Sequence, residues 1–357
     1  MADITIKLNQ QPKAIPNNDK LGFGLHFADH MLVMDYNREK GWHNCSIEPY
    51  APIQIEPSMM ALHYGQAIFE GMKAFRAIDG NINLFRARDH FRRFNDSARR
   101  VCIPEIDVED LVRGLKKLIE IDHKWVPSGH GTALYIRPFI FATDPFLGVR
   151  PSHTYKLMII LSPVGAYYAE GFNPVKIMVE DEYVRAVRGG IGAIKTPGNY
   201  AASLLAAVKA QKKGFTQVLW LDAHELKWLE EVGTMNIMVK IDDEVITPPL
   251  NGSILPGITR DSTIKILKNW RIQITEKQIG IDEVFKAAEE GRLKEMFGTG
   301  TAAVISPVGS IHYKEKNVTI NQGQVGELSQ QLFDEITGIQ YGGKADINGW
   351  IDIVRIS

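Results

Sequence analysis

The sequence predicts a mixed α/β (α+β) protein of two domains. Its 357 residues exceed the length that one hydrophobic core usually organises. Segments with the two-residue period of strands alternate with segments of helical period in both halves of the chain. A stretch rich in glycine, proline and aromatic residues interrupts this pattern near the midpoint. We therefore expect a domain at 1–163, an interdomain loop at 164–174 and a second domain at 175–357.

The composition excludes several classes of protein. Hydrophobic residues make up 45% and charged residues 23%, which is typical of globular proteins, and the net charge of −1 gives no electrostatic attraction to nucleic acid or anionic membranes. Cys45 and Cys102 form no Cys-x-x-Cys motif, which argues against a metal site and a disulfide framework. The N-terminus does not resemble a signal peptide, and no apolar run is long enough for a membrane span. We expect a cytoplasmic protein that acts on small molecules.

Strands and turns are expected in the first 85 residues. Prolines and glycines punctuate the region 1–60, where 27–36 is a strand candidate. A hairpin is predicted over 71–85, because Asp79-Gly80 supplies a turn that needs positive φ angles. Its core face would carry Met72, Ala74 and Ile82.

Two helices are predicted next. The first, 86–101, carries six arginines. Such a face is usually solvated and paired with nearby acids, although one arginine is also a candidate phosphate ligand. The second helix covers about 108–124, with leucines on one face and Asp107 as its N-cap.

Strands return at 133–142 and 156–161. The two-residue period of the first strand puts Tyr135 and Arg137 on the same face. A phenol and a guanidinium side by side can bind a carboxylate. Structural pairing of Arg137 with an acid is the alternative interpretation.

One lysine dominates the second half of the chain. Lys195 lies in a glycine-flanked loop before an alanine-rich helix predicted at 200–213, and the next charged residue downstream is Lys209. A desolvated lysine can lose its proton and act as an amine nucleophile or a Schiff-base residue. Taken alone, this window equally describes an ordinary solvated loop lysine.

A carboxylate and two turns add to this pattern. Glu231 lies between the apolar strand candidates 218–222 and 237–241, where a buried carboxylate needs a cationic or proton-bearing partner. A proline-glycine turn feeds a helix with Thr259 near its start, and its amides form a ready anion site. A plain capped helix explains Thr259 equally well. A second tight turn, 298–303, also offers amides and hydroxyls, but it is not a P-loop.

Together these groups match the needs of pyridoxal 5'-phosphate. That cofactor requires a Schiff-base lysine, an acid at its pyridine nitrogen, a donor at its ring hydroxyl and a phosphate cradle. The sequence also resembles the branched-chain amino acid aminotransferases, which are fold type IV enzymes of the class IV pyridoxal-phosphate-dependent aminotransferase family. The resemblance runs over nearly the whole chain, in segments 27–31, 62–76, 134–138, 161–165, 183–186, 195–200, 231–236, 255–260 and 300–302.

The resemblance implies a fold and a reaction. The fold would pair a smaller N-terminal α/β domain with a larger C-terminal pseudo-barrel domain of the D-amino acid aminotransferase type. The reaction would be reversible ping-pong transfer of the amino group between L-leucine, L-isoleucine or L-valine and 2-oxoglutarate, with pyridoxal 5'-phosphate as cofactor. A homodimer is also implied, in which the partner subunit completes the active site.

The resemblance assigns cofactor roles residue by residue. Lys195 would form the Schiff base and act as general base and acid. Glu231 would pair with the pyridine nitrogen, and Tyr200 would contact the ring hydroxyl. Thr234 is also expected at the cofactor. The phosphate would be held by Arg93, Ile258, Thr259 and Thr301.

Substrate contacts are implied in the same way. The α-carboxylate would meet Thr234 and the backbone of Ala302, with Ala303 beside it. Arg137 would take the side-chain carboxylate of glutamate. The aliphatic pocket would contain Phe27, Phe69, Tyr135, Tyr167 and Thr234, with Tyr64 and Val149 supplied by the partner subunit.

One departure and two alternatives accompany the resemblance. Mammalian members carry a Cys-x-x-Cys where this sequence has Ala303 and Ser306, so redox control of that type is not expected. A D-amino acid aminotransferase or an aminodeoxychorismate lyase of the same fold would use an equivalent lysine and glutamate. The strand with Tyr135 and Arg137 favours the branched-chain interpretation. A non-catalytic protein that binds pyridoxal phosphate would have little use for the substrate-side residues.

Overall fold

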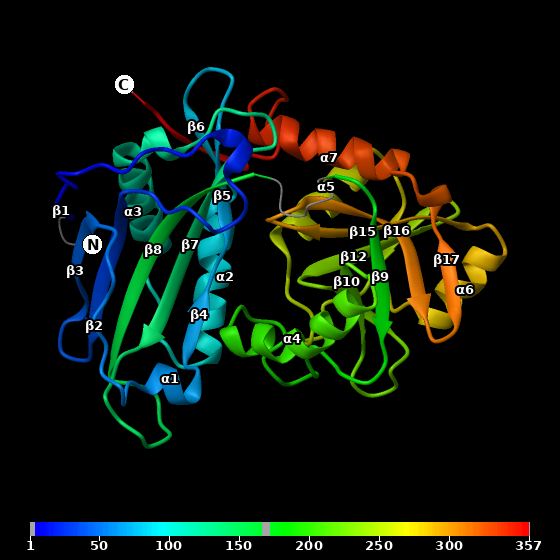
Figure 1. Cartoon of the computed structure of the whole chain (residues 1–357), viewed down its shortest axis with the longest axis horizontal. Coiled ribbons are helices and arrows are strands. Elements are labelled where there is room, and N and C mark those ends of the chain that lie inside the picture. The colour runs from blue at the N-terminus through cyan, green and yellow to red at the C-terminus, as the bar shows by residue number, and fades with distance from the viewer. Residues whose placement is uncertain (1–3, 166–171, 357) are drawn as a thin grey trace. The chain divides into compact units, whose positions relative to one another are not determined.

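The computed structural model describes residues 4–165 and 172–356, which form two compact units (Figure 1). The N-terminal unit comprises Met1–Tyr167, Lys195–Pro197 and Gly338–Ser357, and the C-terminal unit comprises Tyr168–Ile194 and Gly198–Thr337. Among the described residues, no helix combines the length and the hydrophobicity that crossing a bilayer requires.

A largely antiparallel sheet forms the centre of the N-terminal unit. Its order is β1-β3-β2-β8-β7-β5-β6-β18, and β4 pairs with β7. Only the short β1 runs parallel to its neighbour β3 in this sheet. The strands are β1 (Thr5–Ile6), β2 (His30–Asn37), β3 (Gly41–Pro49), β4 (Ala67–Phe69), β5 (Met72–Arg76), β6 (Ile82–Phe85), β7 (Ala133–Ala142), β8 (Thr154–Val164) and β18 (Ile351–Val354).

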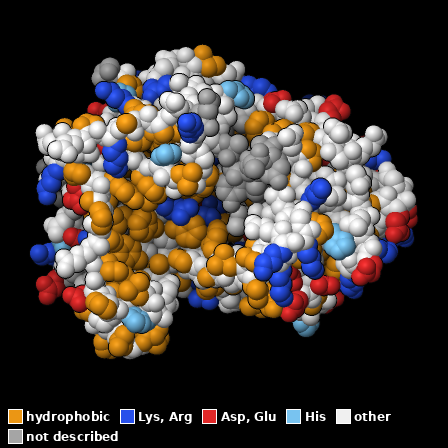
Figure 2. Space-filling view, viewed as in Figure 1, with side chains coloured by type: hydrophobic (Ala, Val, Ile, Leu, Met, Phe, Trp, Pro, Cys, Tyr) orange, Lys and Arg blue, Asp and Glu red, His pale blue; other side chains and the backbone are white. Residues whose placement is uncertain are grey.

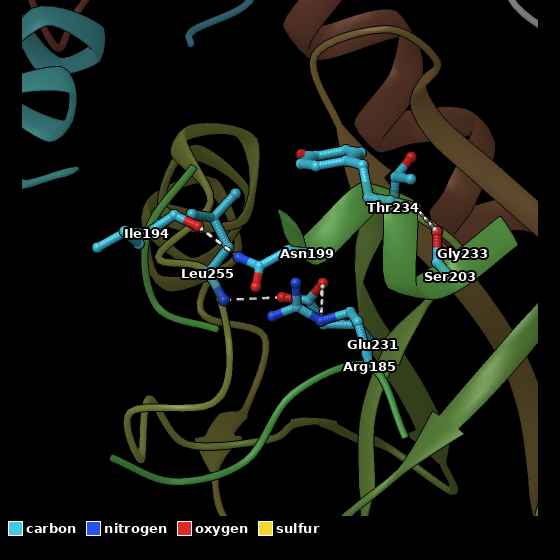
Figure 3. A pocket seen from close by; sticks show the side chains of 9 residues that line it. Arg185, Ile194, Asn199, Ser203, Glu231, Gly233, Thr234 and Leu255 are labelled. Carbon is cyan, nitrogen blue, oxygen red and sulfur yellow. Dashed lines mark hydrogen bonds and ion pairs between the residues drawn. The ribbon is translucent and has the colours of Figure 1, made fainter. Parts of the chain in front are cut away.

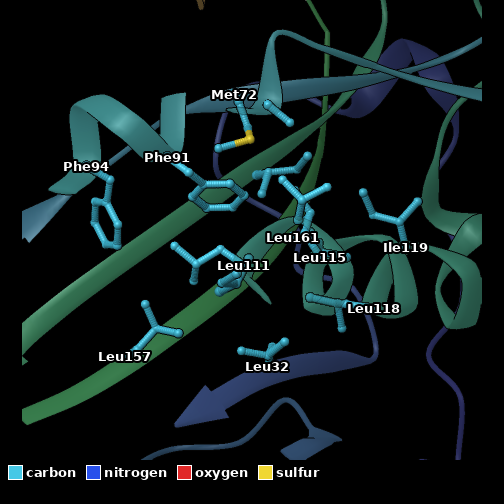
Figure 4. Close-up of a cluster of buried hydrophobic side chains, with 14 of the residues drawn as sticks. Leu32, Met72, Phe91, Phe94, Leu111, Leu115, Leu118, Ile119, Leu157 and Leu161 are labelled. Carbon is cyan, nitrogen blue, oxygen red and sulfur yellow. The ribbon is translucent and has the colours of Figure 1, made fainter. Parts of the chain in front are cut away.

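Helices α2 (Ala87–Arg100) and α3 (Val108–Ile121) contribute to the main core of this unit. Their apolar faces pack with sheet side chains such as Met72 and Leu157 (Figure 4). The predicted N-cap of α3 is confirmed, because the Asp107 side chain accepts a hydrogen bond from the Asp110 amide. Shorter elements are α1 (Met60–Tyr64), η1 (Asn18–Lys20) and η2 (His123–Trp125).

The predicted hairpin is confirmed. Strands β5 and β6 pair antiparallel, and Gly80 adopts a φ of 86° in the connecting turn. The three predicted core residues are all buried in the cluster that contains the helices, namely Met72, Ala74 and Ile82.

The opposite face of the same sheet carries a second apolar cluster. Successive side chains of a strand alternate between faces, so the odd-numbered residues of β7 lie away from α2 and α3. Met31, Phe141 and Met158 form part of this second cluster, which Phe139 joins at its edge. Figure 2 shows hydrophobic side chains gathered over this part of the N-terminal unit. Tyr135 and Arg137 share this face by the same alternation.

The last segment of the chain differs from the predicted domain range. Strand β18 pairs antiparallel with β6, with Ile351 opposite Phe85, and the segment Gly338–Ser357 belongs to the N-terminal unit. The predicted range 175–357 assigned this segment to the second domain. Local periodicity identifies a strand but carries no information about which distant strand it pairs with.

A closed ring of six strands forms the centre of the C-terminal unit. The order β11-β10-β9-β16-β15-β12 is closed by pairing of β11 with β12, and β13, β14 and β17 extend it. The ring strands are β9 (Val175–Glu180), β10 (Gln217–Leu221), β11 (Leu229–Val232), β12 (Met235–Ile241), β15 (Leu293–Gly300) and β16 (Val304–Tyr313), and the additional strands are β13 (Glu244–Thr247), β14 (Ile274–Glu276) and β17 (Lys316–Thr319).

Four helices complete the described secondary structure. They are α4 (Pro197–Lys212), α5 (Ile258–Asn269), α6 (Ile281–Glu289) and α7 (Glu327–Gln340), with a short η3 (Asn321–Gly323). Helix α4 begins three residues earlier than predicted, because proline suits the first turn of a helix. The predicted turn 298–303 is shorter than expected, since Gly298–Gly300 still belong to β15 and only 301–303 turn.

Candidate active site

A pocket in the C-terminal unit collects several of the predicted residues (Figure 3). It lies beside β11 and the start of α4. The residues that line it are Arg185, Ile194, Asn199, Tyr200, Ser203, Glu231, Gly233, Thr234 and Leu255. Three predicted cofactor residues, Tyr200, Glu231 and Thr234, therefore share one pocket.

Glu231 is buried and held by three groups. Its Oε2 lies 3.1 Å from Nε of Arg185, which is the cationic partner that the sequence required. Its Oε1 accepts hydrogen bonds from the Leu255 amide at 2.7 Å and from the Asn236 side chain at 3.5 Å. Figure 3 shows the carboxylate between the Leu255 amide and the Arg185 guanidinium. The carboxylate is thus fixed at the pocket wall as an anion.

The neighbouring Glu230 serves a different purpose. It points to the other face of β11, as strand alternation requires, and accepts a hydrogen bond from the Ser253 hydroxyl. Burial raises the pKa of Glu230, although the Ser253 hydrogen bond opposes this shift. Of the two adjacent glutamates, only Glu231 lines the pocket.

The start of α4 is joined to the loop before Lys195. Asn199 donates hydrogen bonds to the carbonyls of Ile191 at 2.8 Å and Ile194 at 2.9 Å. Tyr200 follows directly and is half-buried at the pocket. The sequence Gly198-Asn199-Tyr200 therefore fixes the loop and places the phenol together.

The start of α5 offers the predicted anion site. Gly257 is the N-cap residue, and a Cβ at this position would lie 1.9 Å from Asn236 Oδ1. The glycine is therefore required for the close approach of the helix start to Asn236. Amides at a helix N-terminus favour anions, and Ile258 and Thr259 are the first two residues of α5. Leu255, three residues earlier, lines the pocket.

The second predicted turn lies outside the pocket lining. Thr301, Ala302 and Ala303 connect β15 to β16 and are half-buried. Strand pairing places Thr299 opposite Asn236, which itself contacts Glu231. The turn therefore begins two residues beyond a strand position that neighbours the Glu231 site.

Lys195 belongs to the N-terminal unit, where its peptide is anchored on both sides. Its amide donates to the Ser97 hydroxyl at 3.0 Å, and its carbonyl accepts from the Phe69 amide at 3.1 Å. The next residue, Thr196, donates to the Ala67 carbonyl at 2.8 Å. The half-buried Lys195 ammonium lies 4.9 Å from the centre of the Phe69 ring. This lysine is a fixed residue and not a loosely solvated one.

Arg93 is held by a fully buried carboxylate that the sequence analysis did not identify. Its Nε and Nη2 donate to the two oxygens of Glu70 at 2.7 and 2.9 Å. Nδ1 of His90 lies 3.0 Å from Glu70 Oε2, and the Gly71 amide donates to the same oxygen. Although burial opposes ionisation, Arg93 and His90 hold the pKa of Glu70 well below its usual range. The three-residue spacing of His90 and Arg93 on one helix is the sequence signal that was available.

Tyr135 and Arg137 lie together as predicted. Nη2 of Arg137 donates to the Tyr135 hydroxyl at 3.0 Å, and the guanidinium lies 4.7 Å from the Phe69 ring centre. In the described part of the chain, no carboxylate forms an ion pair with Arg137. The alternative of structural pairing with an acid is therefore not supported there. A Cβ at Gly71 would lie 2.0 Å from the Tyr135 hydroxyl, so this glycine makes room for the phenol.

Lys73 is a further cation near this pair. It pairs across strands with Tyr135, and cross-strand partners project to the same face of a sheet. Burial lowers the pKa of Lys73 to about 8. The sequence analysis missed it because only the strand register reveals its neighbour.

The remaining predicted substrate residues have varied surroundings. Phe27 is half-buried and stacks on Tyr50, with ring centres 5.0 Å apart. Tyr64 is 41% exposed and Val149 is 85% exposed, and the Tyr64 hydroxyl donates to the carbonyl of Leu147. Tyr167 lies outside the described residues. Within the described ranges, no cluster of three or more metal-ligating side chains occurs.

The chain belongs to the class IV aminotransferase family, whose model matches residues 67–311. Within that family its relatives have one activity in their names. Branched-chain-amino-acid aminotransferase 2 of Bacillus subtilis (strain 168) is 55% identical over 347 residues, covering 97% of this chain and 96% of that protein. A probable branched-chain-amino-acid aminotransferase of Staphylococcus aureus (strain N315) is 52% identical, covering 98% of each chain.

Solved structures agree with these matches. The Escherichia coli branched-chain amino acid aminotransferase has a TM-score of 0.78 at 28% identity, covering 92% of this chain and 99% of that chain. The branched-chain amino acid aminotransferase of T.th., solved with pyridoxamine 5'-phosphate, has a TM-score of 0.75 at 25% identity, covering 91% and 98%. The predicted family, the two-domain fold type IV architecture and the aminotransferase activity are confirmed.

Proposed function

We propose that this aminotransferase moves the amino group between L-leucine, L-isoleucine or L-valine and 2-oxoglutarate, with pyridoxal 5'-phosphate as cofactor. The observation that carries the proposal is the pocket in which a buried, arginine-paired Glu231 lies with Tyr200 and Thr234. The two relatives at 52% and 55% identity support the choice of substrate class.

The residues present fit this cofactor. An anionic carboxylate fixed by Arg185 is the group that a protonated pyridine nitrogen requires, and the close approach enforced at Gly257 leaves a helix start beside it for a phosphate. Lys195 would hold the cofactor, and Tyr200 would contact its ring hydroxyl. Arg93, Ile258, Thr259 and Thr301 would hold the phosphate, with Thr234 beside the ring. When bound, pyridoxal phosphate withdraws electrons from the α-carbon of the amino acid.

The chain's own groups then handle the proton. The Lys195 amine takes the proton from the α-carbon of the donor amino acid, and it returns a proton to the α-carbon of the new amino acid in the second half-reaction. Because Ser97 and Phe69 bind the backbone of Lys195, only its side chain needs to move. Glu231 keeps a negative charge beside the ring nitrogen throughout.

Substrate selection rests on both kinds of side chain. Thr234 and the Ala302 amide would bind the α-carboxylate, with Ala303 adjacent. The aromatic rings of Phe27, Phe69, Tyr135 and Tyr167 would contact an aliphatic side chain. The Arg137 guanidinium would bind the second carboxylate of glutamate, for which its position beside the Tyr135 hydroxyl is suited.

A homodimer completes the proposal. Tyr64 and Val149 are exposed in one chain, as expected for residues that act in the partner's site. Helix α4 also exposes apolar side chains, Leu204, Leu205 and Val208, which a second copy would cover. We also propose a cytoplasmic location, which the two free cysteines, Cys45 and Cys102, support.

Steady-state assay of the purified protein tests the proposal. We expect glutamate to form from leucine and 2-oxoglutarate in the presence of pyridoxal phosphate. Absence of leucine-dependent glutamate from well-folded, cofactor-loaded protein would contradict it. Turnover of D-alanine instead would indicate a D-amino acid aminotransferase, and release of pyruvate from aminodeoxychorismate would indicate the lyase. Cofactor binding without any turnover would indicate a binding protein.

A further inference from the structure

Arg185 has no part in the roles proposed above, yet it is buried at the pocket and contacts three separate segments. It lies between β9 and the loop that leads to Lys195. Burying a guanidinium is costly unless its donors are used. The contacts of Arg185 therefore indicate what it does.

The first contact is the ion pair with Glu231. Nε of Arg185 lies 3.1 Å from Oε2, while the other carboxylate oxygen is bound by the Leu255 amide. Figure 3 shows the two side chains one against the other. A cation at this distance favours the ionised form of a buried carboxylate.

The other contacts join two loops. Nη2 of Arg185 donates to the carbonyl of Gly192 at 2.9 Å and to the carbonyl of Ser253 at 2.6 Å. Gly192 lies three residues before Lys195, and Ser253 lies five residues before the start of α5. A Cβ at Gly192 would lie 2.2 Å from the Ser253 carbonyl oxygen, so the two loops meet closely where the guanidinium binds them.

We propose that Arg185 is a positioning residue that keeps Glu231 ionised at the pyridine nitrogen and fixes the loops before Lys195 and α5 in the cofactor-binding arrangement. This inference rests on the proposed function. It assigns one guanidinium to three parts of the site, and each part lies in a different segment of the chain.

The charged groups around Glu231 are few. In the described part of the chain, the titratable residues that line the pocket with it are Arg185 and Tyr200. Glu230, on the same strand, bonds to Ser253 on the other face, and the charges of Arg185 and Asp222 act on it. Removal of Arg185 therefore leaves Glu231 buried without its cation, and a buried carboxylate without a cation takes up a proton more readily.

The test compares Arg185→Met, Arg185→Lys and Glu231→Gln with the wild type. The Kd for pyridoxal phosphate is measured from quenching of protein fluorescence between pH 6 and 9, with the unfolding temperature of the cofactor-free protein measured in parallel. We expect Arg185→Met to bind pyridoxal phosphate roughly tenfold or more weakly at pH 7, because a buried charge pair is broken. Its affinity should recover as pH rises and Glu231 ionises. Arg185→Lys keeps a positive charge and should restore affinity without that pH dependence.

Two comparisons separate this role from a purely structural one. In the Glu231→Gln background, Arg185→Met should weaken binding by less than about threefold, because the charge it holds is already gone. Arg76→Met is the matched control, since Arg76 donates to the backbone carbonyls of His123, Val126 and Gly80. It should lower the unfolding temperature without a pH-dependent Kd.

Each outcome has a meaning. Equal effects of Arg185→Met with and without Glu231, or a Kd whose pH dependence matches that of Arg76→Met, would overturn the inference. If Arg185→Met does not fold, the Arg185→Lys and Glu231→Gln pair still tests it, because full loss of affinity in Arg185→Lys at every pH would contradict a role through charge. Failure of the wild type to bind pyridoxal phosphate would instead overturn the proposed function.

Discussion

Each unit of the molecule contains a buried arginine–glutamate pair, and the two pairs are built in opposite ways. In the N-terminal unit, both oxygens of Glu70 bind Arg93, and His90 and the Gly71 amide surround the same carboxylate. In the C-terminal unit, Glu231 contacts Arg185 through one oxygen and lines a pocket, while the Arg185 guanidinium also binds two backbone carbonyls.

The difference indicates which partner works in each pair. Glu70 is fully enclosed, so it can act only by orienting the Arg93 guanidinium. Arg185 has several donors occupied by the protein backbone, so it orients Glu231, whose carboxylate is at the pocket wall. We therefore propose that the arginine binds ligand in one unit and the glutamate binds ligand in the other. The same buried pair supports phosphate binding in the first case and ring protonation in the second.

If both pairs serve the amine of Lys195, its loss should exceed the loss of either pair. Lys195→Ala should lower kcat by roughly 1,000-fold or more, since both anchor and proton carrier disappear. The measurement is leucine-dependent glutamate formation, together with borohydride reduction of the loaded protein. Lys209→Ala, which removes an exposed lysine paired with Glu182, is the control. Borohydride-stable labelling of the Lys195→Ala variant at another lysine would refute the assignment.

Glu231→Gln should act mainly on the chemical step. A neutral amide keeps the shape of the side chain but cannot hold the ring nitrogen protonated. We expect kcat to fall by about 100-fold, the scale of losing one transition-state electrostatic contact. Absorbance of bound cofactor should show occupancy reduced much less than kcat. An unchanged kcat would rule out Glu231 as the pyridine partner.

Glu70→Gln should act mainly on binding and folding. It leaves the buried Arg93 without its counter-charge, which costs about 3 kcal/mol of unfolding free energy. The Kd for pyridoxal phosphate should rise by about tenfold or more, as Arg93 loses its orientation. Denaturant unfolding and cofactor titration measure the two effects, and kcat at saturating cofactor should change little. If kcat falls as far as in Glu231→Gln while the Kd stays at the wild-type value, the two pairs do not differ as proposed.

Arg137→Ala should separate the two substrates of the reaction. Its guanidinium would bind the side-chain carboxylate of glutamate, which leucine lacks, so KM for glutamate should rise by about tenfold and KM for leucine by much less. Tyr135→Phe is the matched control, because it removes only the hydroxyl that accepts from Arg137. Equal changes in both KM values would mean that Arg137 is structural.

Local features of this molecule were predictable from the sequence. Period-two and helical patterns located the β5–β6 hairpin, α2 and α3 because each is stabilised by its own apolar face. The need of Glu231 for a cation also followed from a carboxylate in an apolar strand region. Its identity did not, because Arg185 lies 46 residues earlier in the chain and only the barrel brings the two together.

Long-range pairing set the limit of that prediction. The return of β18 to the N-terminal sheet, the position of Lys73 beside Tyr135 and the enclosure of Glu70 by α2 depend on strand register or tertiary packing. None of these leaves a periodic signal within its own segment. Residues that orient other residues were missed more often than residues expected to touch a ligand, since motifs are assembled around the ligand.

The smallest expected effect concerns acid stability of the Glu70 pair. Burial lowers the pKa of His90, although Glu70 opposes that shift. As pH falls below about 6.5, the ordinary histidine value, the unfolded chain therefore binds a proton that the folded chain does not, and stability decreases. The lowered pKa of Glu70 adds a further loss below about 4.3, in the same direction. In denaturant unfolding, His90→Asn should flatten the decline of the unfolding free energy between pH 7 and 5 by up to about 1.4 kcal/mol per pH unit. His224→Asn, at an exposed position, should leave the slope unchanged, and the same slope in wild type and His90→Asn would show that His90 is already protonated in the folded protein.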